Sequence, residues 1–354
     1  MRMLATASHR IAWLQPSLTR IARVVLLAIV SLPASAISQG VRVEVGPHGD
    51  WDEAIDLRND SVRLVVVPAI GRILHYGWID EGNLLYTNPE LDGVVLAEGE
   101  SYTQDGSPKH AAFGGDRVWT TSEELFVEIR GRRDLPDHWT DGSPNRFKLV
   151  DRGVVIETPV SRLLGISVRR QIKLSPEGTV VEIAQTLTKH QPAANERLDS
   201  FPVTIWNLTK LHGIRQTWQP LADQSVFKNG YYVPSWSLYR VKGNFQVEKG
   251  LVKLTPQKIN GQKIGVDSPG WVAGWNGETL MVEQFDYLDG ETYPDGGTSS
   301  AVYTNPAFTE LECLSPERVL EPGQSIEHTI RWELHRIDSE EAAEDCLMQL
   351  QEPR

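Results

Sequence analysis

The sequence predicts an all-β protein, built as one large antiparallel sandwich or barrel with a short helix near its C-terminal end. Three observations predict this class. Short runs rich in valine, isoleucine and aromatic residues recur over most of the 354 residues. Several runs alternate apolar and polar residues, which is the period of a half-buried strand. Turn signals separate the runs at intervals of about 8–15 residues, as in sandwiches and barrels.

The predicted elements follow one another along the chain. The expected strands are 63–68, 72–78, 125–130, 154–160, 165–174, 179–188, 201–209, 271–275 and 279–287, with two more inside 305–334. The run 165–174 shows the clearest alternation, because Ile166, Val168 and Ile172 share one face. After the last strand, Ser339 can cap a helix over 340–350, whose first turn is acidic. We find no linker, and therefore predict a single domain over 37–354.

Residues 1–36 have the pattern of a secretory signal peptide. Four arginines and no acid occur in 1–23, followed by the apolar run 24–33 and Ala34-Ser35-Ala36. The apolar run is too short to span a bilayer comfortably, although an uncleaved anchor is the alternative. We therefore expect cleavage near Ala36, a periplasmic or secreted protein, and no integral membrane span in the mature chain.

Charge and motif content exclude several classes of function. The formal net charge is −12, and it becomes −16 without the four leader arginines. Such an acidic chain would be repelled by phosphate backbones, so nucleic acid is not an expected partner. Nucleotide-binding, zinc-protease and serine-hydrolase motifs are missing from the sequence, so no cofactor and no metal is expected. Cys313 and Cys346 could remain free thiols or form a disulfide.

Two long loops, 86–118 and 212–268, are expected to carry function. The first ends in a Gly114-Gly115 turn with His110, Asp116 and Trp119 around it, which fits either a binding loop or an ordinary surface loop. The acidic stretch 49–60 is interpreted as solvated surface.

The strand 201–209 places Trp206 beside Thr204, on the less apolar face. An indole ring there could stack on a sugar, or it could pack in the core.

The segment 305–334 carries the most informative alternation. A period of two places Glu310 and Glu312 on one face of a strand and Leu311 and Cys313 on the other. The two carboxylates could be a wetted surface or the acid/base groups of a pocket.

Several segments together resemble the uncharacterised DUF4380 family. They are VVVPAIGRILHYGW, FGGDRVW, QTLTKHQPA, FPVTIWNLTKL and YTNPAFTELECLSPERVLEPGQSIEHTIRWEL, and they cover most of 60–335. That family resembles galactose mutarotase-like proteins, which bind carbohydrate with a large antiparallel β-supersandwich. The resemblance implies that a C-terminal glutamate acts as base, with Glu312 preferred over Glu310. Phe113 stands where mutarotases have one histidine, and the counterpart of their second histidine motif, Ile205-Trp206-Asn207-Leu208, also has no histidine. His110 or His212 could substitute, and His110 is the candidate acid.

The resemblance implies an extracytoplasmic carbohydrate-binding protein. If the protein catalyses a reaction, the resemblance implies a sugar mutarotase or epimerase. The expected ligand is a mono- or oligosaccharide. The candidate catalytic residues are Glu312, Glu310 and His110, and the candidate substrate contacts are Arg72, Asp116, Trp119, Trp206 and Asn207. A non-catalytic glycan-binding module and a cell-envelope interaction domain remain alternatives. Glycoside hydrolysis would need two carboxylates about 5–10 Å apart across a cleft, and Glu310 and Glu312 supply only one side of it.

Overall fold

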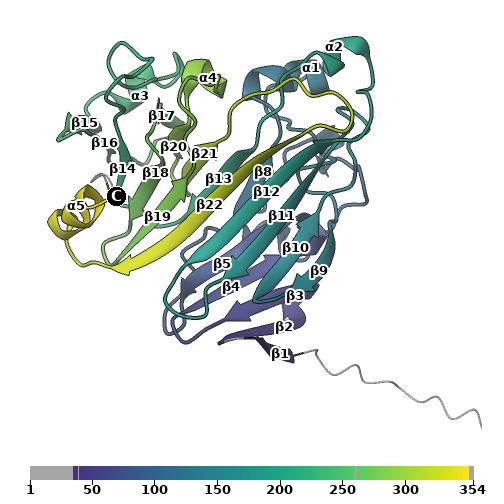
Figure 1. Ribbon diagram of the computed structural model, residues 1–354, viewed down its shortest axis with the longest axis horizontal. Coiled ribbons are helices and arrows are strands. Elements are labelled where there is room, and N and C mark those ends of the chain that lie inside the picture. Colours follow the sequence, from purple (N-terminus) through teal and green to yellow (C-terminus); the bar gives the residue numbers. More distant parts are fainter. Residues whose placement is uncertain (1–34, 39, 260, 351–354) are drawn as a thin grey trace, which may run out of the picture. The chain divides into compact units, whose positions relative to one another are not determined.

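The computed structural model describes residues 35–38, 40–259 and 261–350, which form a β-sandwich of two ten-stranded sheets (Figure 1). Neighbouring strands of each sheet pair in antiparallel register, for example with Lys210 opposite Glu310. The predicted all-β antiparallel class is therefore confirmed. The predicted signal peptide lies outside the described residues, apart from its last two positions.

The first sheet carries the candidate site. In spatial order its strands are β1 (Ser35–Ser38), β2 (Val41–His48), β3 (Trp51–Arg58), β4 (Val62–Val67), β5 (Arg72–Trp78), β8 (Asp116–Trp119), β13 (Trp206–Leu211), β21 (Thr309–Leu314), β20 (Ser300–Thr304) and β17 (Gln262–Val266).

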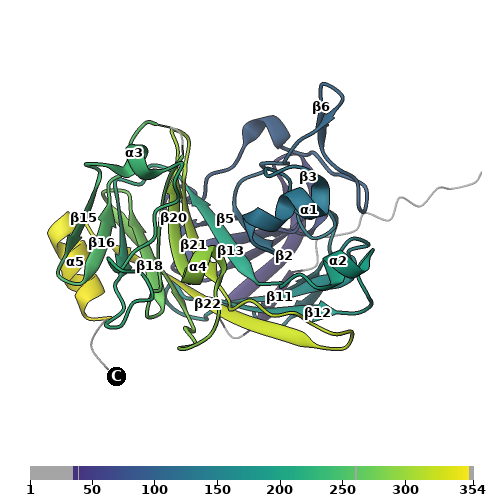
Figure 2. The same ribbon diagram turned by 90° about the horizontal axis from the view of Figure 1, so that it is seen from above.

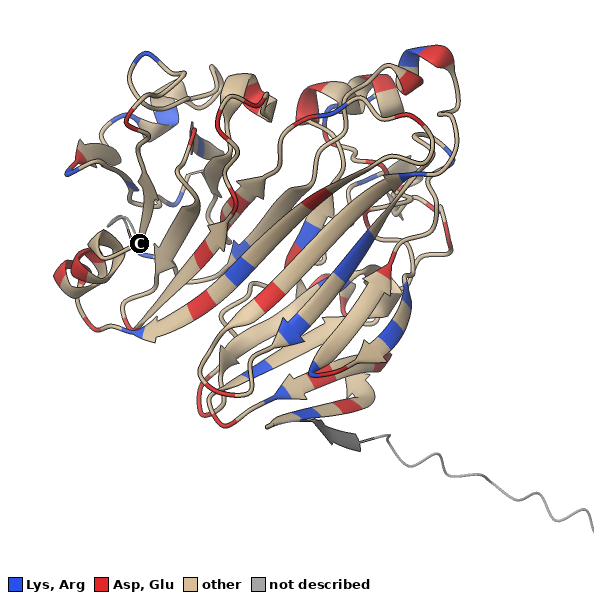
Figure 3. Cartoon of the chain, viewed as in Figure 1, with Lys and Arg blue, Asp and Glu red and all other residues tan. Residues whose placement is uncertain are grey.

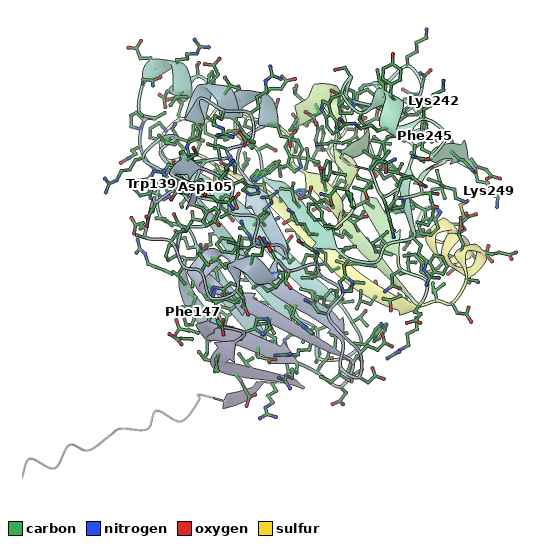
Figure 4. All side chains as sticks on the ribbon, turned by 180° about the vertical axis from the view of Figure 1, so that it is seen from behind. Asp105, Trp139, Phe147, Lys242, Phe245 and Lys249 are labelled. Atoms are coloured by element: carbon green, nitrogen blue, oxygen red, sulfur yellow. The ribbon has the colours of Figure 1, made fainter. Side chains whose placement is uncertain are left out.

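The second sheet packs against the first. In spatial order its strands are β15 (Phe245–Glu248), β16 (Leu251–Leu254), β14 (Gln216–Pro220), β18 (Trp271–Trp275), β19 (Thr279–Phe285), β22 (Ser325–Arg336), β12 (Val181–Lys189), β11 (Ile166–Leu174), β10 (Gly153–Glu157) and β9 (Arg146–Val150). Figure 4 labels Phe245 and Phe147, which belong to its two outermost strands, and both pack against the main core.

Short elements connect the strands. The helices are α1 (Phe126–Arg130), α2 (Glu196–Asp199), α3 (Leu238–Val241), α4 (Pro294–Gly297) and α5 (Glu340–Met348). The 3₁₀ turns are η1 (Pro68–Ile70), η2 (Pro89–Leu91) and η3 (Glu123–Leu125), and a small hairpin joins β6 (Thr103–Gln104) to β7 (Ser107–Pro108). None of the described helices is long and apolar enough to cross a membrane.

The main core lies between the sheets and is built from alternate strand positions. Leu311 and Cys313 of β21 meet Ile330 and Trp332 of β22 there, all with no exposed surface. Figure 3 shows acidic and basic residues interspersed over the strands and loops around this core. The alternation predicted for the segment 305–334 is confirmed, because Leu311 and Cys313 point inward.

The C-terminal helix is also confirmed. The Ser339 side chain accepts a hydrogen bond from the backbone N–H of Ala342, which is an N-cap contact. Ala343 and Leu347 of α5 pack against a tryptophan-rich cluster of the second sheet. Cys346 on this helix and Cys313 in the core are both free, so the two cysteines do not pair.

Three sequence predictions of local structure need correction. The predicted strand 125–130 is the end of η3 followed by helix α1, in which Phe126 and Ile129, three residues apart, are the buried positions. Gly131 ends this helix in the left-handed region, with φ of 72°. A short apolar run is compatible with a helix turn as well as with a strand, and here the Gly131 C-cap favours the helix.

The acidic stretch 49–60 is solvated on one side only, since 51–58 form β3 and only Asp52 and Glu53 of this strand are exposed. Trp51, Ala54, Ile55 and Leu57 are buried on this strand, while acids occupy the positions between them. The predicted loop 212–268 likewise contains β14 to β17 and α3, so it is not one continuous loop.

Candidate functional site

A cavity of about 330 Å³ lies on the face of the first sheet that points away from the core. Its floor comes from strands β8, β13, β21, β20 and β17, and its polar members are Arg117, Lys210, Glu310, Glu312, Tyr303 and Lys263. Figure 2 shows α1 and α3 on opposite sides of β13, β21 and β20. Phe126 of α1 and Trp236, which precedes α3, both line the cavity, so its walls come from segments distant in the sequence.

The strand register arranges this floor. Lys210 lies opposite Glu310, Glu310 opposite Tyr303, and Tyr303 opposite Lys263, in one row across four strands. Glu312 lies in the next row, opposite Ala301. Because side chains alternate along a strand, all five polar groups share one face. The methyl group of Ala301 leaves room beside Glu312.

Glu312 is the most perturbed carboxyl of the floor. Its Oε2 accepts a hydrogen bond of 3.0 Å from Trp206 Nε1 and lies 3.2 Å from Lys263 Nζ. Only 1 % of the residue is exposed. Burial raises the pKa of this carboxyl to about 7, while the Lys263 ammonium opposes the rise. At neutral pH, Glu312 is therefore divided between a proton acceptor and a proton donor.

Lys263 is the buried cation that faces Glu312. Its Nζ also lies 3.5 Å from Asp295 Oδ2 and 4.5 Å from the centre of the Trp206 ring. Burial acts to lower the pKa of Lys263, but the carboxylates around it, led by Glu312, outweigh burial and raise this pKa. The two partners shift in the same direction because Glu312 is desolvated, whereas Lys263 faces several acids. We conclude that Lys263 stays charged while Glu312 titrates.

Glu310 is held by two cations. Arg117 Nη2 lies 3.3 Å and Lys210 Nζ 3.6 Å from its Oε1. Burial lowers the pKa of the Lys210 ammonium to about 8, although Glu310 opposes this shift. The ammonium also lies 3.9 Å from the centre of the Phe308 ring. Lys210 can therefore give up a proton near neutral pH.

His110 lines the cavity but is poorly suited as an acid. Its Nε2 accepts a hydrogen bond from Arg117 and lies 3.2 Å from Asp141 Oδ2. Burial, followed by the Arg117 charge, lowers the pKa of His110 to about 4. The imidazole is thus neutral at pH 7, and Lys210 is the better matched proton donor.

Asp141 organises the groups below the cavity. It pairs with Arg72, lies 3.6 Å from Arg117 Nη1, and accepts a hydrogen bond of 3.2 Å from Trp119 Nε1. Burial acts to raise the pKa of Asp141, but the charges of Arg72 and Arg117 outweigh it and hold this pKa well below its usual range. The carboxylate is therefore charged and fixes the Arg117 and Trp119 side chains.

The structure brings four predicted site residues together. His110, Trp119, Glu310 and Glu312 all line the cavity. Glu310 and Glu312 are only 6 % and 1 % exposed, so of the two alternatives the pocket applies and not the wetted surface.

The other four predicted contacts lie elsewhere. Trp206 has no exposed surface, lies below Lys263 and reaches the cavity only through Glu312, so it cannot act as an open stacking platform. Arg72 lies behind Asp141 and does not line the cavity.

Asp116 and Asn207 point to the opposite face, between the sheets. There Asp116 pairs with Arg170 of the second sheet and accepts a hydrogen bond of 2.6 Å from Asn207 Nδ2. Asp116 and Asn207 therefore do not line the cavity, because the ion pair draws both side chains into the core.

The candidate residues chosen from the sequence omit several that line the cavity. They are Arg117, Glu123, Lys210, Trp236, Lys263 and Tyr303. The strand alternation that selected Glu310 could have selected Lys210, which follows the inward-facing Thr209. Glu123 and Trp236 come from connecting segments, and no local pattern links them to the floor. Within the described residues, no group of three or more His, Cys, Asp or Glu is placed to hold a metal ion.

Comparisons with known proteins agree with this fold. The family model described as domain of unknown function (DUF4380) matches residues 53–335. A candidate mutarotase (YeaD) from Salmonella typhimurium is 10 % identical, with a TM-score of 0.51 over 86 % of this chain and 97 % of that one. A TPR-domain containing protein from Parabacteroides distasonis is 13 % identical, with a TM-score of 0.50 over 85 % of this chain and 57 % of that one.

A candidate aldose 1-epimerase from Escherichia coli K12 is 12 % identical, with a TM-score of 0.46 over 84 % of this chain and 100 % of that one. No curated protein shows significant sequence similarity to the chain. At these identities the likeness to the Salmonella protein supports a shared sandwich fold and nothing finer.

Proposed function

The chain belongs to the DUF4380 family, and we propose that its cavity binds a sugar and interconverts its anomers, as an aldose mutarotase or epimerase-like isomerase. One observation carries the proposal. A buried carboxyl, Glu312, has its pKa near 7 in the floor of a cavity that Trp119, Trp236 and Tyr303 also line. Aromatic rings beside a few placed polar groups suit a pyranose, whose C–H faces are apolar and whose rim is polar.

The proposed reaction needs one base and one acid. Ionised Glu312 takes the proton of the anomeric hydroxyl, and a protonated acid gives one to the ring oxygen as the C1–O5 bond breaks. Lys210 is the proposed acid, because its pKa of about 8 leaves it mostly protonated at pH 7. The open-chain aldehyde then rotates about C1–C2, and the reverse proton transfers close the ring.

The test is the rate of anomer relaxation of freshly dissolved α-glucose, α-galactose and α-mannose, followed by polarimetry. We expect the wild type to accelerate relaxation for at least one sugar, and Glu312→Gln to lose about 10²–10⁴-fold. Glu182→Gln, an exposed carboxyl on β12, is the matched control. Equal rates for the wild type and Glu312→Gln on all three sugars would exclude Glu312 as the base.

Carbohydrate binding without turnover is a second candidate, favoured by one observation. Both floor carboxylates already face cations, Glu310 with Arg117 and Lys210, and Glu312 with Lys263. Such pairing suits a rigid recognition surface. In that case Trp119→Ala weakens sugar binding measured by calorimetry, while no sugar relaxes faster than in buffer.

We also propose that the protein works outside the cytoplasm, as the leader-like pattern of residues 1–36 suggests. The test is the N-terminal sequence of protein recovered from the periplasm or medium. An N-terminus near Ile37 supports export with cleavage, whereas an intact Met1 in the cytoplasmic fraction contradicts it.

A further inference from the structure

A second cavity of about 320 Å³ adjoins the first, and nothing described so far uses it. The two cavities share Glu123, Arg133, Trp236 and Lys263 as lining residues. They are therefore two halves of one trough with a common boundary. The volume of each half is within the range of about 300–1,000 Å³ typical of small-molecule sites.

The boundary is firmly built. Ser237 Oγ donates to the Lys263 carbonyl at 3.0 Å and accepts from the Lys263 N–H at 2.8 Å. Tyr232 and Gly265 exchange two backbone hydrogen bonds of 2.7 and 2.8 Å. The segment 232–237 is thus attached to β17, the strand that carries Lys263, and the two sides of the boundary are held in register.

Trp236 stands at this boundary with 45 % of its surface exposed. Its ring centre lies 6.4 Å from that of Tyr303. A Cβ atom at Gly261 would come within 3.1 Å of the indole ring, so the glycine permits this close packing. An exposed indole held between two cavities is a stacking surface available to a ligand that enters both.

The charges of the second cavity restrict the ligand. Its walls carry the carboxyl groups of Glu123, Glu124 and Asp295 against the cations Arg133 and Lys263. Lys263 already pairs with Asp295 and Glu312. An anionic group would therefore meet an excess of acid in this half of the trough.

We propose that the trough is a two-subsite site for an uncharged disaccharide, with one ring in each cavity and Trp236 beside the linkage between them. This inference rests on the proposed sugar site and specifies its ligand. The second ring is recognised in the second cavity by Tyr232 and Ser235 together with the acidic wall.

The test is isothermal titration calorimetry of the full mature chain. The probes are glucose and galactose, the neutral disaccharides cellobiose, maltose and lactose, and the uronate analogue of cellobiose. We expect at least one neutral disaccharide to bind about tenfold or more tightly than either monosaccharide, which corresponds to roughly 1.4 kcal/mol. The uronate analogue should bind more weakly than cellobiose.

Two variants and a control locate the effect. Ser235→Trp fills the second cavity from an exposed position, and Trp236→Ala removes the boundary indole. Both should bring the disaccharide affinity down to the monosaccharide level. Tyr239→Ala removes a neighbouring aromatic ring that is 91 % exposed and lines neither cavity, and it should retain the disaccharide preference.

The outcomes separate this inference from the proposed function. Equal affinity for monosaccharides and disaccharides, or an unchanged preference in Ser235→Trp, overturns the second subsite and leaves the sugar site intact. If the uronate analogue binds more tightly than cellobiose, the inference that the second cavity disfavours an anionic group is overturned. No binding to any probe overturns the subsite and the sugar site together.

Discussion

Replacing Lys263 by methionine should raise the pKa of Glu312 well above its value of about 7. The ammonium lies 3.2 Å from Glu312 Oε2. At an effective dielectric constant of about 20, Coulomb's law gives roughly 5 kcal/mol for two unit charges at that separation. If only a third of this is realised, the pKa rises by about one unit, because one unit corresponds to about 1.36 kcal/mol. Less than about a tenth of Glu312 would then be ionised at pH 7.

The titration can be measured without any enzymatic activity. Infrared difference spectra of the protonated carboxyl band over a pH series, with Glu312→Gln as the blank, give the midpoint in wild type and in Lys263→Met. Lys253→Met removes the same charge from β16, where Lys253 pairs with Glu340 at 3.0 Å and with Glu344, and should leave the midpoint unchanged. A midpoint in Lys263→Met that equals or falls below the wild-type value would refute the electrostatic reasoning.

Three further predictions concern stability. Burial raises the pKa of Glu283 to about 8 from 4.5, so the folded protein holds a proton that the unfolded chain releases, and stability falls as pH rises through this window. In urea unfolding, Glu283→Gln should flatten this pH dependence and raise the free energy of unfolding at pH 9 by about 3–5 kcal/mol over wild type. Parallel pH profiles for the two proteins would contradict this. Asp141→Asn leaves the buried Arg72 and Arg117 guanidinium groups without their carboxylate, and should lower the free energy of unfolding in the same assay by about 3–5 kcal/mol. A decrease below about 1 kcal/mol would contradict the stabilising role of these ion pairs. Gly115→Ala places a Cβ 2.1 Å from a backbone oxygen at φ of +65°, and should lower the melting temperature far more than Gly178→Ala, which has φ of +70° and open space.

Much of the sandwich could be predicted because its strands alternate or carry dense β-branched runs. The failures have physical causes. In β3, the acids next to Trp51 and Ala54 make the sequence look polar, so the buried face of the strand is not apparent from the sequence. It is defined by the pairing of β3 with β2 and β4. At 125–130, an apolar run too short to show its period folds as a helix, because Gly131 supplies a left-handed cap.

The candidate site was predictable where the alternation of side chains along a strand determines which residues share a face. Glu310 and Glu312 share a face whatever the fold, and the inward Leu311 fixes which face it is. Alternation alone does not show which of two adjacent polar residues points inward. Asp116 turns into the sandwich and Arg117 into the cavity, because Arg170 from the second sheet supplies a buried partner. That partner is 54 residues away, and no local pattern reveals it.

The attachment of segment 232–237 to β17 has a consequence for solubility. β17 is the outermost strand of its sheet, and the unpaired peptide groups of such a strand can recruit an extended segment of another molecule. Tyr232 and Ser237 occupy those groups at Gly265 and Lys263. The same short segment that borders the trough thereby protects a sheet margin from intermolecular β-pairing, so loosening it would favour aggregation as well as weaken the ligand boundary.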